Sequence, residues 1–190
     1  MVKINKIYTR SGDGGKTHLV GGTMVDKDSV RVQAYGEVDE LNSWIGMVRT
    51  LAEARGLKPI GDRLAQIQNE LFDAGAELAS PAGGPHPAVP KITPAHWTRV
   101  ENWIDEWNEG LPELTSFVLP GGTEMNATLH IARTVCRRAE RSIWALLRSE
   151  PVNPELPKYF NRLSDLLFAL ARRESQLSGK PEYLWTAGKS

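Results

Sequence analysis

Apolar residues recur at spacings of three and four along most of the chain after residue 30. That spacing returns a side chain to the same face of an α-helix at each turn, so each repeat predicts a helix with one buried seam. No alternating pattern of the kind that predicts a β-strand competes with it in this region. The predicted seams are Val38, Leu41, Ile45, Val48 and Ala52; Leu64, Ile67, Leu71, Ala74 and Leu78; Trp97, Val100, Ile104 and Trp107; Leu129, Ala132, Cys136, Ala139, Ile143 and Leu146; and Phe160, Leu163, Leu167 and Leu170.

Capping and helix-breaking residues mark the ends of these stretches. The first helix is predicted to stop at Gly56, and the third to begin with Thr93 as N-cap and Pro94 in its first turn. The longest helix follows a Pro-Gly-Gly break, takes Thr123 as its N-cap and continues without Pro or Gly to about Arg148. The last helix follows three closely spaced prolines. The ends therefore agree with the periodicity.

Seams of this kind on helices joined by short turns predict an all-α fold, namely a left-handed, up-and-down helical bundle of about five helices, ferritin-like in type. The bundle is expected over residues 31–180, after an irregular Gly-rich segment at residues 1–30. With 190 residues, 41% of them hydrophobic, the chain can bury a full core. A single domain over residues 1–190 is therefore predicted.

Several polar side chains lie one position away from the buried seams, at the margin of the core. They are Asp39, Arg133, Arg137, Asn161 and Asp165. A charged group at such a half-buried position costs several kcal/mol unless it is paired or bound to a ligand. Two explanations stay open: ion pairs between helices or across a subunit interface, or an anionic ligand bound by Arg133 and Arg137, which lie one helical turn apart.

The loop at residues 10–17, RSGDGGKT, contains glycines, hydroxyls and a lysine that could surround phosphate oxygens. It is not a P-loop, because the Walker pattern requires a glycine where the chain has Arg10. A flexible N-terminal tail remains the alternative interpretation.

Composition removes several classes of function. Lys plus Arg and Asp plus Glu both total 23, so no net charge attracts the chain to nucleic acid or an anionic membrane, and neither is an expected partner. No apolar run approaches the roughly 20 residues of a membrane span, and the first residues lack the apolar region of a signal peptide. One cysteine, Cys136, excludes an internal disulfide and fits a reducing compartment. A cytoplasmic location is expected.

Two catalytic motifs are excluded by spacing. A di-iron carboxylate site in a bundle requires Glu-x-x-His pairs, and none of the 4 histidines has a glutamate three residues before it. No serine lies in a G-x-S-x-G elbow. We expect His130 at the surface of its helix or at an interface rather than as a catalytic base.

Four ordered segments carry a resemblance to a known family. They read YTRSGDGGKT at residues 8–17, YGEVDELN at 35–42, FVLPGG at 117–122 continuing to RTVCRRAER at 133–141, and NRLSD at 161–165. Together they resemble the PduO-type ATP:cob(I)alamin adenosyltransferases. The match spans nearly the whole chain, and four motifs in one order are far more specific than any one of them.

The resemblance implies a cobalamin adenosyltransferase-like bundle and a definite reaction. The 5′-deoxyadenosyl group of ATP would pass to the cobalt of cob(I)alamin, giving adenosylcobalamin and triphosphate. It also implies a homotrimer with ATP between adjacent subunits and cobalamin beside it. A flavin-type reductase and a B12-dependent acceptor enzyme are implied as partners, and Mg²⁺ as a cofactor held mainly by the ATP phosphates, with Glu140 as a candidate ligand.

Individual roles come from the same resemblance. The residues implied in ATP binding are Thr9, Arg10, Ser11, Gly12, Gly15, Lys16, Thr17, Lys27, Arg137, Arg138, Glu140, Arg141 and Asn161. Those implied in cobalamin binding are Phe117, Asp165 and Phe168, and those implied in catalysis are Arg137, Phe117, Asp39 and Arg133. Asp39 and Arg133 match an intersubunit salt bridge, and Phe117 matches an aromatic residue that keeps the lower axial ligand off cobalt.

Two alternatives to this enzyme remain at the level of sequence. One is a non-catalytic helical-bundle oligomer that binds a nucleotide or phosphate, and the other is a purely structural trimer. For Phe117 the alternative is a loop aromatic that plugs the end of the bundle.

Overall fold

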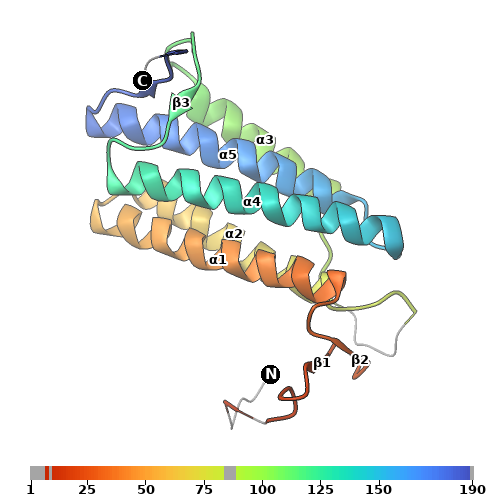
Figure 1. Cartoon of the computed structure of the whole chain (residues 1–190). Helices are drawn as coiled ribbons and strands as arrows, with labels where there is room; N and C mark the ends of the chain where they lie inside the picture. The colour runs from red at the N-terminus through yellow and green to blue at the C-terminus, as the bar shows by residue number, and fades with distance from the viewer. Residues whose placement is uncertain (1–6, 9, 84–88, 189–190) are drawn as a thin grey trace.

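The computed structural model describes residues 7–8, 10–83 and 89–188. Within these ranges lie the five helices α1 (Val30–Ala54), α2 (Lys58–Leu78), α3 (Pro94–Asn108), α4 (Glu124–Ser149) and α5 (Glu155–Ser178). They run side by side with their long axes roughly aligned (Figure 1). The predicted all-α bundle of about five helices is confirmed. None of the helices in these ranges is both long and apolar enough to cross a membrane.

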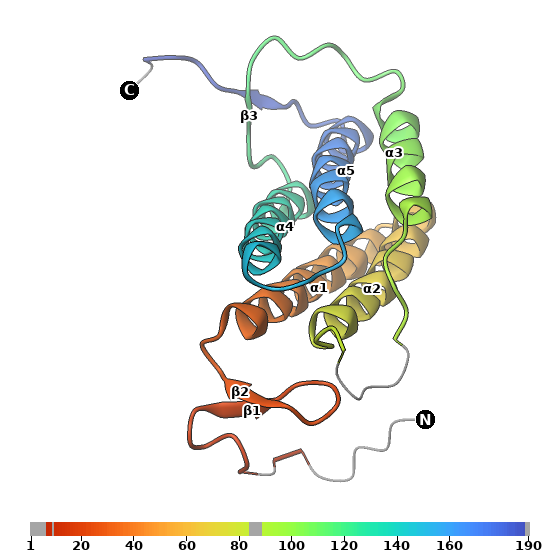
Figure 2. The same ribbon diagram turned by 90° about the vertical axis from the view of Figure 1, so that its right-hand side faces the viewer.

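The packing order of the helices differs from their order in the chain. Helix α1 lies between α2 and α4, and α5 lies between α4 and α3. Figure 2 shows α3 at the outer edge of this arrangement, against α5. The seams predicted on α1, α2, α4 and α5 are buried in one continuous core. Helix α3 differs: only Val100 of its predicted seam is buried, because an edge helix has neighbours over a narrower arc.

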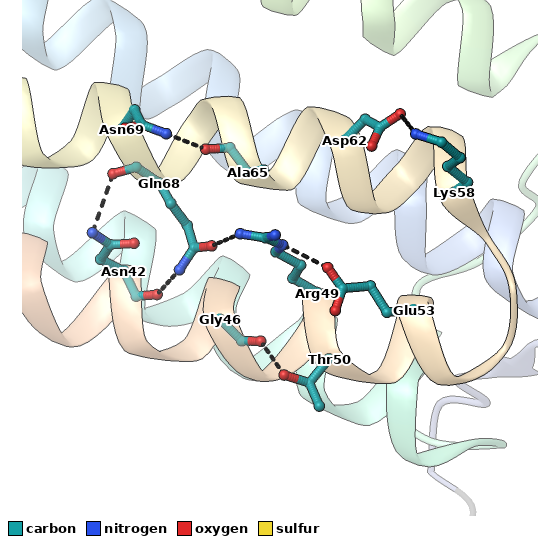
Figure 3. A network of polar contacts seen from close by, with 10 residues as sticks. All are labelled: Asn42, Gly46, Arg49, Thr50, Glu53, Lys58, Asp62, Ala65, Gln68 and Asn69. Carbon is teal, nitrogen blue, oxygen red and sulfur yellow. Dashed lines mark hydrogen bonds and ion pairs between the residues drawn. The ribbon is translucent and has the colours of Figure 1, made fainter.

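Hydrogen bonds fix the neighbouring helices α1 and α2 in register (Figure 3). Asn42 Nδ2 donates to the Gln68 carbonyl at 3.2 Å, and Arg49 Nη1 donates to Gln68 Oε1 at 3.3 Å. Gly46 faces this contact, and a Cβ built on it would lie 3.2 Å from Gln68 Nε2. The absence of a side chain at Gly46 therefore lets the two helices approach closely.

Two short antiparallel strand pairs lie outside the bundle. Strands β1 (Lys16–His18) and β2 (Met24–Asp26) form a hairpin in the N-terminal segment. Strands β3 (Val118–Leu119) and β4 (Tyr183–Leu184) pair the segment before α4 with the segment after α5. Both views place the hairpin near the start of α1 and the β3 pair at the opposite end of the bundle (Figures 1 and 2). The expectation of no strand after residue 30 was wrong at β3 and β4, because two-residue strands are too short to show an alternating pattern.

Candidate functional site

A hollow of about 730 Å³ opens beside α4 and α5, under the segment that carries β3. Its volume lies within the range of roughly 300–1,000 Å³ that is usual for small-molecule sites. The residues that line it are Leu114, Thr115, Ser116, Phe117, Val118, Arg133, Arg137, Ser164, Asp165, Phe168 and Trp185. Five residues predicted from the sequence, Phe117, Arg133, Arg137, Asp165 and Phe168, therefore meet at one place.

Helix geometry explains the two helical walls of the hollow. Arg133 and Arg137 lie one turn apart on α4, and Asp165 and Phe168 lie one turn apart on α5, so each pair faces the same way. Tight packing of α4 on α5 turns these faces toward one another. At this contact Cys136 Sγ donates to a backbone carbonyl of α5 at 3.2 Å.

Asn126 connects the third wall of the hollow, which is the segment that carries β3, to the two helical walls. Its side-chain Nδ2 donates to the Ala171 carbonyl of α5 at 2.8 Å, and its Oδ1 accepts from Gly121 N at 3.2 Å. The Pro-Gly-Gly break, the start of α4 and the middle of α5 are thus joined through one buried amide. This residue sets where Phe117 leaves the bundle. Sequence reasoning missed Asn126, although an amide among the apolar residues of a helix is a signal for such a role.

Phe117 lies at the rim of the hollow with 78% of its surface exposed. Its ring meets the ring of Trp185 edge to face, with centroids 6.1 Å apart. An aromatic side chain that plugged the end of the bundle would be buried, so the structural alternative for Phe117 is wrong. Trp185 was not singled out in the sequence, because its position depends on the β3–β4 pairing.

Neither arginine of the hollow forms a direct ion pair in the described part of the chain. The ion pairs found there do not include Arg133 or Arg137. Burial and the neighbouring Arg137 both lower the pKa of the Arg133 guanidinium. Asp165 lies across the hollow, where burial raises its pKa and the charges of Arg162 and Arg137 oppose that rise, so one carboxylate faces two cations. Two close guanidinium groups with one carboxylate opposite them leave a net positive charge, which suits a phosphate chain.

His130 is buried behind Arg133, with 2% of its surface exposed, so the expectation of a helix-surface or interface histidine was wrong. Its Nδ1 accepts a hydrogen bond of 3.3 Å from Arg133 Nε, and its ring meets Phe168 edge to face. Its Nε2 has no partner among the described residues. Burial and then Arg133 lower the pKa of His130 to about 4. The imidazole is therefore neutral at physiological pH and acts as an acceptor for the arginine.

A second polar group follows α4 and α5 beyond the hollow. Asn161 Nδ2 donates to Glu140 Oε1 at 3.3 Å, and Asn161 Oδ1 accepts from Arg162 Nη1 at 2.5 Å. Arg141 is exposed, and Arg138 forms ion pairs with Glu40 and Glu37 of α1. Arg138 thus has acidic partners within its own chain, unlike the two arginines of the hollow.

The predicted ATP loop forms a structured turn. Thr9 lies outside the described residues. Beyond it, Lys27 N donates to the Gly15 carbonyl at 2.9 Å. A Cβ on Gly12 would lie 2.8 Å from Lys27 Nζ, so the lysine covers this glycine. Lys16 Nζ forms an ion pair with Asp26 at 2.9 Å across the hairpin. The loop that contains Arg10, Ser11 and Thr17 is therefore hydrogen-bonded rather than a loose tail.

The hairpin lies near the start of α1, whereas β3, whose segment borders the hollow, lies at the opposite end of the bundle (Figure 1). Asp39 is exposed on α1 and forms no ion pair, with Arg133 or any other residue, in the part of the chain that the structure describes. It borders a groove of about 430 Å³ between α1 and α2, next to the 69% exposed Phe72. The residues predicted to bind one ATP therefore do not all meet within one chain.

A metal site made by the protein alone is not found. Within residues 7–8, 10–83 and 89–188, no group of three or more His, Cys, Asp or Glu side chains is placed to hold a metal ion. Mg²⁺ is usually held by one or two carboxylates together with substrate phosphates. A single carboxylate such as Glu140 therefore fits Mg²⁺ binding only when substrate phosphates supply further ligands.

Comparisons with known proteins agree with this geometry. A family model described as cobalamin adenosyltransferase matches residues 7–174. A corrinoid adenosyltransferase of Mycobacterium leprae (strain TN) is 49% identical over 177 residues, which cover 90% of this chain and 92% of that protein. One of Bacillus subtilis (strain 168) is 45% identical over 175 residues, covering 92% of this chain and 89% of that protein.

Solved structures of similar proteins show the same fold. A variant PduO-type ATP:corrinoid adenosyltransferase from Lactobacillus reuteri, complexed with cobalamin and ATP, superposes with a TM-score of 0.89. It is 40% identical in sequence, and the match covers 95% of this chain and 99% of that chain. A second variant, complexed with ATP, superposes with a TM-score of 0.88 at 39% identity, covering 95% of this chain and 100% of that chain.

Proposed function

The chain belongs to the cobalamin adenosyltransferase family, and on that premise we propose that the hollow under β3 binds a corrinoid next to the phosphates and ribose of ATP. The protein is an ATP-dependent corrinoid adenosyltransferase: it transfers the 5′-deoxyadenosyl group of ATP to the cobalt of cob(I)alamin. The products are adenosylcobalamin and triphosphate. The transferase function of its relatives favours this enzyme over a non-catalytic nucleotide-binding bundle.

One observation supports the placement of the site: Arg133 and Arg137 line the hollow without a direct ion pair, opposite Asp165 and Phe168. The guanidinium groups suit the phosphates of ATP, and the aromatic ring suits the apolar edge of a corrin ring. We assign Phe168 and Asp165 to corrinoid binding. We assign Asn161, Glu140 and Arg141 to the nucleotide, with Arg138 beside them.

Charge in the reaction develops on the leaving triphosphate. Cob(I)alamin is a strong nucleophile: the cobalt–carbon bond forms as the bond between the 5′ carbon and the phosphate oxygen breaks, and the electron pair leaves with triphosphate. No general base is required, which agrees with a neutral, buried His130. Arg137, Lys16 and Lys27 are proposed to stabilise the triphosphate, each charge-assisted contact contributing roughly 1.5–3 kcal/mol. Bound Mg²⁺ would neutralise further phosphate charge, with Glu140 as its protein ligand.

A second copy of the chain completes the proposed site. The hairpin with its ATP loop and the arginines of the hollow lie apart in one protomer, so the loop of one subunit is assigned to the arginine face of the next. Asp39 of one subunit would then pair with the unpaired Arg133 of its neighbour. The proposed assembly is a homotrimer with ATP at each interface.

Phe117 is assigned to the lower face of the corrin ring. Its exposed position at the rim leaves the ring free to occupy the place of an axial ligand on cobalt. Cob(II)alamin without that ligand is easier to reduce, so Phe117 would assist formation of cob(I)alamin. A flavin-type reductase is the proposed electron donor, and a B12-dependent enzyme the proposed acceptor of product. A single cysteine, which permits no disulfide within the chain, supports the proposed cytoplasmic location.

Turnover tests the proposal directly. Protein, ATP and chemically reduced cobalamin are mixed without oxygen, and the cob(I) spectrum is followed as it converts to that of light-sensitive adenosylcobalamin. Arg137→Lys should lose most activity because a lysine cannot grip two phosphate oxygens at once. Arg148→Lys, an exposed residue in the last turn of the same helix, is the matched control. Equal activity of the two variants would remove Arg137 from the site.

A further inference from the structure

The segment after α5 returns to the hollow and ends beside Phe117. Helix α5 stops at Gly179, which is left-handed with φ 65°, and the chain then pairs β4 with β3. Figure 1 shows the segment after α5 turning back beside β3. This segment thus runs along the same strand that leads to Phe117.

Trp185, the first residue after β4, is attached to Phe117 by backbone and by ring. Its N–H donates to the Phe117 carbonyl at 2.8 Å, and its carbonyl accepts from Ser116 Oγ at 2.6 Å. The two rings meet edge to face at an interplanar angle of 63°. The indole also lines the hollow itself. These two hydrogen bonds therefore fix the position of Trp185 relative to Phe117.

Exposure makes this contact matter for the ring of Phe117. A phenylalanine with 78% of its surface exposed has few neighbours that limit its rotamers. Edge-to-face contact with an aromatic neighbour is a preferred geometry, so the indole selects among those rotamers. If the Phe117 ring has to lie at a fixed place below the cobalt, contact with the indole orients that ring before the corrinoid binds.

We propose that Trp185 is a positioning residue for Phe117, holding its ring at the rim of the hollow in the orientation that meets the lower face of the corrinoid. The inference rests on the proposed role of Phe117 and extends it to the C-terminal segment. Because the role acts through Phe117, it concerns the route that starts from cob(II)alamin. The attack of cob(I)alamin on ATP does not depend on it.

The test compares two starting states of the same substrate. Trp185→Ala should lower the rate from cob(II)alamin plus reductant at least about tenfold more than the rate from pre-reduced cob(I)alamin, since a misplacement of about 1 Å in an active site can cost up to about a hundredfold. The affinity for ATP should not change. Trp185→Phe, which keeps a ring edge, should restore most of the lost rate. An equal loss from both starting states would overturn the proposal.

Tyr183→Ala is the matched control. Tyr183 belongs to β4 and lies over Gly121, where an added Cβ would meet its ring at 3.5 Å, but it does not line the hollow. Its loss weakens the attachment of the segment without removing the indole. Tyr183→Ala should therefore not show the difference between starting states. If it matches Trp185→Ala, strand attachment rather than the indole is responsible and the proposal is wrong.

A double variant separates this inference from the proposed function. If Trp185 acts through Phe117, adding Trp185→Ala to Phe117→Ala should cause no further loss. Additive losses would mean that the indole contacts the corrinoid directly, which contradicts a role that acts through Phe117. If Phe117→Ala alone shows no difference between cob(II) and cob(I), the proposed role of Phe117 fails instead.

Discussion

Acid should destabilise this protein through His130. The residue is buried with its Nδ1 accepting from Arg133 Nε, and burial followed by the charge of Arg133 lowers its pKa from 6.5 to about 4. The unfolded chain therefore binds a proton at this site over the pH range in which the folded protein does not. Stability from this group is complete above about pH 6.5 and decreases as the pH falls toward 4.

The size of the effect follows from the two pKa values. Between an unfolded value of 6.5 and a folded value of about 4, linkage gives a loss of about 2 kcal/mol at pH 5. The loss reaches a limit of about 3 kcal/mol below pH 4. For a domain of ordinary stability, that is a large part of the free energy of unfolding.

Urea denaturation at several pH values between 7.5 and 4.5 measures this loss. His130→Asn is the comparison, because an amide oxygen can still accept from Arg133 but does not titrate in this range. The variant is expected to be less stable than the parent at pH 7.5, because part of the ring is lost. That difference should shrink by about 2 kcal/mol by pH 5, since only the parent loses stability through this site.

Two results would refute the reasoning. A difference between parent and variant that stays constant with pH would mean that His130 has an ordinary pKa in the folded protein. A direct titration of the imidazole by NMR that gave a midpoint near 6.5 would have the same meaning. Either result would also mean that burial and the charge of Arg133 do not lower the pKa of His130 as the structure indicates.

Three further outcomes are expected. Arg55→Ala should lower the free energy of unfolding by about 3–5 kcal/mol, measured in urea, because it leaves the fully buried Glu174 carboxylate without its partner; a loss below 1 kcal/mol would contradict this. Removal of residues 1–15 should keep the helical circular dichroism but abolish ATP binding in a titration, and unchanged affinity would reject the loop as an ATP ligand. Asp39→Ala should dissociate the proposed trimer in sedimentation and lower turnover, and an unchanged assembly with normal activity would rule out the proposed salt bridge to Arg133.

The helices could be predicted because their signals are local. Apolar spacing and the cap at Thr123 act over a few residues, and Thr123 accepts the expected backbone hydrogen bond from Asn126. That Arg133 and Arg137 share one helical face, and Asp165 and Phe168 another, also follows from their spacing. The resemblance in four motifs supplied the family before any contact was known.

The sequence could not predict the burial of His130, the exposure of most of the α3 seam, or the roles of Asn126 and Trp185, because all of these depend on which segments pack together. His130 lies next to a buried seam, and the width of the buried arc on α4 depends on having α1 on one side and α5 on the other. The seam of α3 was read as fully buried for the same reason, since a pattern does not tell how many neighbours a helix has. Asn126 and Trp185 reach the site through contacts with residues far away in the chain.

By itself, then, the sequence determined the number and extent of the helices, the family, and which side chains share a helical face, because backbone geometry repeats within a few residues. Only the tertiary structure decided that the faces of α4 and α5 meet, that Arg133 and Arg137 form no direct ion pair in the described chain, and that Trp185 lies against Phe117. These arrangements depend on which seams pack together. That choice sums many contacts between distant segments, and no single stretch of sequence contains it.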